Sequence, residues 1–98
     1  MPERKRSNQA LVAVGKLLTE KRKALGSVYK SRDGFIGERS QEIFGGDEWI
    51  SVRHLSNIEL GKNWLSIETL IKHAHALETE PVELFSEIFA VYSSNSSN

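Results

Sequence analysis

Apolar side chains recur every three or four residues along most of this 98-residue chain, which is the spacing of helices that bury one face. The apolar positions of the first such segment, residues 9–25, are Leu11, Val14, Leu17, Leu18 and Leu25. Similar patterns predict helices over residues 39–44, 51–61, 66–77 and 81–92. The sequence therefore predicts an all-α protein, a compact bundle of about five short helices.

The helical pattern is interrupted between the first two helices. The turn dipeptide Asp33-Gly34 separates two apolar pairs, so we expect an inserted loop or small hairpin there. At the ends of the chain, residues 1–8 predict a flexible basic arm and residues 93–98 predict a disordered tail. Residues 9–92 then form a single domain.

Two charged residues occupy positions that point toward the predicted core. Leu55 and Ile58 face the same side of a helix, and Glu59, four residues after Leu55, falls on that side. Arg22 falls on the core side of the first helix, four residues after Leu18. Because a buried carboxylate without a partner is strongly destabilising, we expect Arg22 and Glu59 to form a bidentate ion pair. The alternative is that both lie at the edge of the core and contact water.

Charge is distributed unevenly, although the formal net charge is zero. Residues 1–32 contain nine Lys and Arg against two Glu, whereas residues 33–98 contain four Lys and Arg against eleven Asp and Glu. The two segments carry +7 and −7, which favours one basic surface on an acidic body. The alternative is a pair of ordinary solvated faces.

Other chemistry finds no support in the residues. The chain has no cysteine, which excludes disulfides and thiolate metal sites and fits a cytoplasmic protein. His73 and His75 are two apart on a predicted helix, so we interpret them as surface or edge histidines rather than metal ligands. No apolar run approaches the roughly 20 residues of a membrane helix. We expect no enzyme activity, no cofactor, no metal and no membrane contact.

Three stretches resemble the Cro/repressor (Xre-like) helix-turn-helix family of DNA-binding proteins. Residues 40–63, SQEIFGGDEWISVRHLSNIELGKN, are similar to the helix-turn-helix itself, with Gln41 opening its first helix. LLTEKRKALG, residues 17–26, looks like the family's first helix, and SIETLIKHAHALETEPVELF, residues 66–85, looks like its fourth and fifth. The resemblance covers residues 11–85 apart from the loop and implies a lambda-repressor-like fold.

The resemblance also carries a structural expectation and two departures. In the family an Arg on the first helix pairs with a Glu near the end of the recognition helix, and Arg22 and Glu59 match those positions. Glu48 and Trp49 stand where the family has an apolar residue and then Gly in the turn. Residues 27–39 are inserted where the family passes almost directly into its second helix.

The resemblance implies DNA contacts for the recognition helix and its flanks. The residues at base-reading positions are Val52, Arg53 and Asn57. The residues implied to hold the DNA backbone are Gln41, Ser51, His54, Lys62 and Asn63, with a solvated side chain as the alternative for His54. The arm residues expected in the minor groove or on phosphates are Arg4, Lys5 and Arg6.

The last helix carries more apolar residues than one face can hold. We expect Val82 and Phe85 to cap the monomer core. The residues expected to form a two-fold dimer interface are Ile88, Phe89, Val91 and Tyr92. The alternative is that the last helix folds back and completes the monomer core.

These features predict a sequence-specific transcriptional regulator, a repressor that binds a palindromic operator in double-stranded DNA as a homodimer. We expect it in a cytoplasm of prokaryotic or phage type. A second hypothesis is an antitoxin or other protein-interaction module that binds a protein partner. A third is a scaffold for partner proteins, because one fold hosts many functions.

Overall fold

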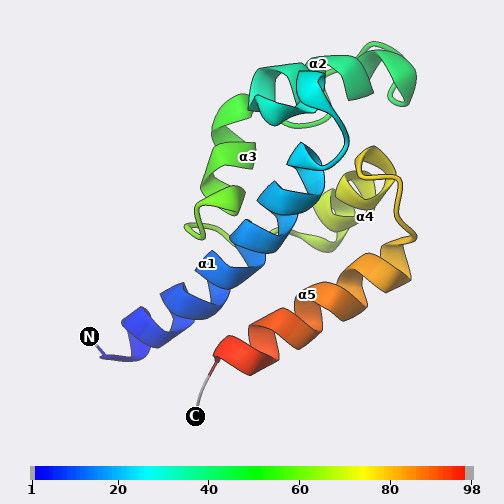
Figure 1. Cartoon of the computed structure of the whole chain (residues 1–98). Helices are drawn as coiled ribbons and strands as arrows, with labels where there is room; N and C mark the ends of the chain where they lie inside the picture. The colour runs from blue at the N-terminus through cyan, green and yellow to red at the C-terminus, as the bar shows by residue number, and fades with distance from the viewer. Residues whose placement is uncertain (1, 97–98) are drawn as a thin grey trace.

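The computed structural model describes the backbone of residues 2–96 and the side chains of residues 9–96. Within this range the chain forms α-helices, one short 3-10 helix and no strand, which confirms the predicted all-α bundle (Figure 1). The elements are α1 (Pro2–Lys23), η1 (Ser27–Lys30), α2 (Arg32–Glu42), α3 (Val52–Glu59), α4 (Ile67–Ala76) and α5 (Pro81–Asn95).

The central element of the bundle is α1. It lies alongside α5 (Figure 1). An ion pair between Lys21 Nζ and Glu87 Oε1 at 2.6 Å joins the two helices. The helix α1 also contacts η1 and α3, while α4 packs against α5. The side chains that fill the centre come from every α-helix; the largest fully buried ones are Val14, Leu18, Phe35, Leu55, Ile58, His73, Leu84 and Ile88.

The segment predicted as an inserted loop or small hairpin between the first two helices instead forms η1 and the start of α2. The hydroxyl of Ser31 caps α2 by accepting a hydrogen bond from Gly34 N at 3.0 Å, and Asp33 lies in the first helical turn. The buried residues that follow have helical spacing: Phe35, Ile36, Arg39 and Ser40. The Asp-Gly dipeptide starts a helix here, since a capping serine precedes it and a buried stripe follows it.

Both terminal helices extend beyond their predicted ends. The first helix begins at Pro2, within the segment predicted as a flexible arm. The arm side chains expected to contact DNA lie outside the described residues: Arg4, Lys5 and Arg6. The last helix continues to Asn95, into the segment predicted as a disordered tail.

The helix α5 buries a different face from the predicted one. Ile88, expected in a dimer interface, is fully buried in the monomer core. Val82 and Phe85, expected to cap that core, are 75% and 45% exposed. Phe89 is 61% exposed, as a surface contact residue requires. Two further residues expected in the interface are instead partly buried against the core: Val91 and Tyr92.

Two glycines let the end of α3 lie directly on the backbone of α1. A Cβ on Gly15 would lie 2.2 Å from the carbonyl oxygen of Glu59 and 2.9 Å from that of Ile58. Just past α3, Gly61 has a φ of 78°, and a Cβ there would lie 2.6 Å from Cα of Val12. No larger residue fits either position without moving one of the two helices.

Replacing Gly15 with Ala is expected to lower the free energy of unfolding by roughly 1–3 kcal/mol, because the methyl group meets rigid backbone. The matched control is Gly37→Ala, also in a helix, where a Cβ has no neighbour within 4 Å. The control should stabilise by about 0.4–1 kcal/mol through the unfolded chain. Urea unfolding measures both, and equal effects would contradict the close contact at Gly15.

Candidate nucleic-acid interface

The first turn of α3 is exposed and carries no acidic side chain. Ser51 caps the helix, since its hydroxyl accepts a hydrogen bond from the backbone N–H of His54 at 3.0 Å. Val52, Arg53 and His54 all face solvent. A helix start normally favours acids because of its dipole, so an exposed basic start interacts well with an anionic partner.

The residues that follow α3 are fixed to its last turn. The backbone N–H groups of Lys62 and Asn63 both donate to the carbonyl oxygen of Asn57, at 2.8 and 3.3 Å. The side chains of Lys62 and Asn63 are exposed, whereas that of Asn57 is half-buried. Of the residues predicted to read bases, Val52 and Arg53 are therefore the accessible ones in the free protein.

The predicted ion pair between Arg22 and Glu59 is present. Arg22 Nε donates to Oε2 of Glu59 at 2.8 Å, and Nη2 donates to Oε1 at 2.9 Å. The two side chains are only 3% and 0% exposed. This bidentate geometry satisfies both carboxylate oxygens of a helix residue that faces the core.

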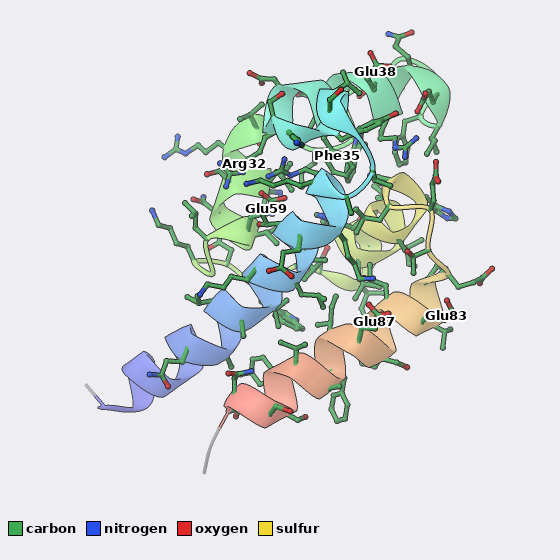
Figure 2. All side chains as sticks on the ribbon, in the orientation of Figure 1. Arg32, Phe35, Glu38, Glu59, Glu83 and Glu87 are labelled. Carbon is green, nitrogen blue, oxygen red and sulfur yellow. The ribbon has the colours of Figure 1, made fainter. Side chains whose placement is uncertain are left out.

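A third residue, Arg32, joins the pair and was not predicted. Its Nε donates to Oε1 of Glu59 at 2.8 Å, and 31% of its side chain is exposed (Figure 2). Arg22 Nη1 also donates to the carbonyl oxygens of Tyr29 and Lys30, at 2.9 and 2.7 Å. The cluster therefore links α1, η1, α2 and α3. The spacing pattern carried no signal for Arg32, because its segment was predicted to be a loop.

Burial alone would raise the pKa of Glu59. The hydrogen bonds from Arg22 and Arg32, together with their charges, outweigh burial and hold the pKa of this carboxyl below its ordinary value. The carboxylate is thus ionised at neutral pH, and two guanidinium groups surround it. Beside them, a groove of about 390 Å³ has charges of both signs in its lining: Lys16, Glu20 and Lys23 of α1, with Arg32 and Glu59.

The prediction that Gln41 opens the helix before α3 is wrong. That helix, α2, begins at Arg32, and Gln41 lies in its last turn. The residues that the resemblance treated as an insertion before the helix form most of the helix itself. The N-terminus of α2 is instead marked by Ser31 and Arg32.

Residues 43–51 connect α2 to α3. Gly45 and Gly46, with φ of 67° and 91°, reverse the chain direction. Trp49 is buried and stacks on Phe44 with ring centroids 5.2 Å apart. The glycines upstream therefore make the turn, and Trp49 anchors it to the core just before the cap of α3.

His73 packs against that anchor. Its ring lies 5.6 Å from Trp49 and 6.3 Å from Phe35, centroid to centroid. The expectation of a surface or edge histidine is wrong for His73, which is buried, whereas His75 is exposed. Burial is the main cause that lowers the pKa of His73 to about 4; the charge of Glu59 opposes this shift in part.

Comparisons with known proteins assign no family to this chain. No protein-family model, curated protein or solved structure matches the chain. The described residues contain no group of three or more His, Asp or Glu placed to hold a metal ion. None of the described helices combines the length and apolarity needed to cross a membrane.

Replacing Glu59 with Ala is expected to lower the free energy of unfolding by roughly 3–5 kcal/mol, because it leaves Arg22 buried without its counter-charge. Arg22→Ala should lose a similar amount, and the double variant less than the sum. Glu20→Ala, an exposed Glu on α1, is the control. Denaturant unfolding decides: additive losses below about 1 kcal/mol each would mean two independent surface charges.

His73 should make the protein less stable as the pH falls. Between its ordinary pKa of 6.5 and its folded pKa of about 4, the unfolded chain binds a proton that the folded chain excludes. The stability lost over this interval is roughly 3 kcal/mol. The loss from Glu59 begins only below its ordinary pKa of 4.5.

The pH dependence is measured by denaturant unfolding between pH 4.5 and 6.5. The slope of the free energy of unfolding against pH should largely disappear in His73→Gln. It should persist in His75→Gln, which changes an exposed histidine on the same helix. An unchanged slope in His73→Gln would show that other groups cause it.

Proposed function

We propose that this protein is a sequence-specific DNA-binding transcriptional regulator, a repressor that acts from the cytoplasm on a palindromic operator. The observation that carries the proposal is the first turn of α3, which is capped by Ser51, lacks acids and exposes Val52 and Arg53. A recognition helix enters the major groove with its N-terminal residues against the bases. The proposal assigns the protein no catalytic chemistry.

The contacts divide between bases and backbone. Arg53 suits the O6 and N7 acceptors of guanine, Val52 suits a thymine methyl, and Asn57 suits adenine once its half-buried amide turns outward. The backbone contacts assigned to the flanks of α3 come from Ser51, His54, Lys62 and Asn63.

A further backbone contact replaces the one expected from Gln41. Arg32 lies at the start of α2, where its charge and the helix amides favour a phosphate, while Asp33 in the same turn opposes this in part. Glu59 holds Nε of Arg32, while the part of this side chain that is exposed remains available. Lys16 and Lys23 line the adjoining groove together with Glu20, so this groove also carries one acidic side chain besides Glu59.

A homodimer is part of the proposal. Val82, Phe85 and Phe89 form an exposed apolar stripe on α5 with helical spacing. Exposed apolar patches usually mark contact surfaces. A two-fold dimer through this stripe would set two recognition helices about one DNA turn apart, roughly 34 Å.

A protein-interaction module, such as an antitoxin, is the second candidate. The observation that favours it is the same apolar stripe, which acidic residues Glu80, Glu83 and Glu87 flank. Binding experiments on the isolated protein distinguish the two functions. A regulator binds a short duplex with a steep salt dependence, and a module of the second kind needs its partner.

Selection of bound duplexes from a random pool tests the proposal directly. The expected result is an enriched sequence with two-fold symmetry and half-sites about 10 base pairs apart. A pool that shows no enrichment after repeated rounds at low salt would overturn the proposed function.

Arg53→Ala is expected to weaken binding to the selected site by about 1–3 kcal/mol and to relax preference at one base pair. Lys62→Ala should weaken binding to all sequences alike and lower the salt slope by about one. Lys72→Ala on α4 is the matched control and should change neither quantity. Fluorescence anisotropy across a salt series measures them, and an unchanged preference in Arg53→Ala would contradict the base-reading role.

Phe89→Glu is expected to give a folded monomer that binds the operator much more weakly, because it places a charge in the apolar contact. Ser86→Glu, an exposed position on the same helix, is the control for added charge. Sedimentation at micromolar concentration measures both. A persistent monomer of 11.0 kDa for the unaltered chain would contradict the dimer.

A further inference from the structure

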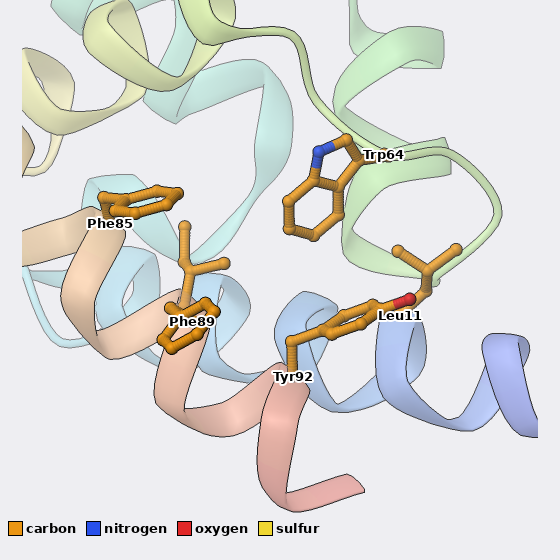
Figure 3. A pocket seen from close by; sticks show the side chains of 6 residues that line it. Leu11, Trp64, Phe85, Phe89 and Tyr92 are labelled. Atoms are coloured by element: carbon orange, nitrogen blue, oxygen red, sulfur yellow. The ribbon is translucent and has the colours of Figure 1, made fainter. Parts of the chain in front are cut away.

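An apolar cavity of about 420 Å³ opens between α1, α5 and the loop that leads from α3 to α4 (Figure 3). Its lining comes from α1, from that loop and from α5: Leu11, Trp64, Phe85, Ile88, Phe89 and Tyr92. No residue of this lining carries a charge. The volume falls within the range of about 300–1,000 Å³ that is usual for small-molecule sites.

The walls of the cavity are aromatic rings in two pairs. Trp64 and Tyr92 meet edge to face with centroids 5.6 Å apart, and Phe85 and Phe89 stack with centroids 6.2 Å apart. Figure 3 shows Trp64 and Phe85 on opposite sides of the opening. Trp64, Phe85 and Phe89 are all exposed in the free protein. A planar ring placed among them would gain stacking and edge contacts and would bury apolar surface.

We propose that this cavity binds a small, neutral, planar aromatic molecule. Neutrality follows from a lining without counter-charges, since a buried charge needs a partner. Planarity follows from the ring faces that form the walls.

The cavity shares Phe85 and Phe89 with the proposed dimer stripe but extends deeper than that stripe. Val82, the most exposed apolar residue of α5, lies outside the lining. Ile88 and Leu11, which belong to the lining, are fully buried and half-buried. Val82 therefore reports on contact between copies, and Trp64 reports on occupancy of the cavity.

The cavity also lies next to the proposed DNA surface, and this step rests on the proposed function. Trp64 follows Lys62 and Asn63 directly, and the amides of those two residues are bound to the end of α3. A ligand bound against Trp64 would therefore lie beside Lys62, a residue of the proposed DNA surface.

The test is a titration of the ¹⁵N-labelled full chain with 2-naphthol, followed by the two indole N–H signals in NMR spectra. The Trp64 signal should shift and saturate with one site and a Kd below about 1 mM, while the signal of buried Trp49 stays unchanged. The sulfonate of the same ring system should bind at least tenfold more weakly. Phe89→Ser should weaken 2-naphthol binding at least tenfold, whereas Val82→Ser should leave it unchanged.

Three results would overturn the proposal. The first is no shift of the Trp64 signal up to the solubility limit of 2-naphthol. The second is equal shifts of both indole signals, which would indicate nonspecific binding. The third is a Trp64 signal that moves only when the protein is diluted, which would mean that a second copy fills the cavity. The titration contains no DNA, so its failure leaves the proposed function untouched, and a failed DNA selection leaves the cavity untouched.

Discussion

The arrangement of the helices in the N-terminal half depends on one buried group, the carboxylate of Glu59. It accepts hydrogen bonds from Arg22 and Arg32, and Arg22 in turn holds the backbone of η1. A buried ion pair of this kind stabilises a fold only when its geometry is good and its remaining hydrogen-bonding groups have partners. Here the three side chains meet that condition, so four elements acquire fixed relative positions at a single point.

The two ends of α3 consequently differ in their burial. The C-terminal end of α3 is buried, ion-paired and pressed against the backbone of α1 at Gly15. Its N-terminal end is exposed, capped by Ser51 and free of acids. Trp49 and His73 pack beneath the preceding turn. A helix held at its C-terminal end and exposed at its N-terminal end supports the proposal that this N-terminus enters a major groove.

The sequence predicted the fold class, the core ion pair and the caps of α3 and α4, because each rests on local spacing or a single side chain. Arg22 and Glu59 stood out as charges on core-facing positions. Arg32 did not, since Asp33-Gly34 favoured a turn and the capping role of Ser31 was missed. Gln41 was misplaced for the same reason.

The buried face of α5 could not be predicted from the sequence, for a different reason. Two apolar stripes, one through Ile88 and one through Phe85 and Phe89, fit the helical period equally well. Which of them meets α1 depends on tertiary packing, and periodicity carries no information about that choice. The cavity beside Trp64 likewise arises from three segments far apart in the chain.

Amide hydrogen exchange of Glu59→Gln compared with the unaltered chain tests the central claim most directly. This substitution keeps the side-chain shape and removes the charge that both arginines bind. The account predicts that the amides of α3 and η1 lose more protection than those of α4 and α5, because local opening near the lost contacts adds to the loss of global stability. Equal loss across all helices, or protection of α3 that is unchanged, would contradict a carboxylate that fastens α3.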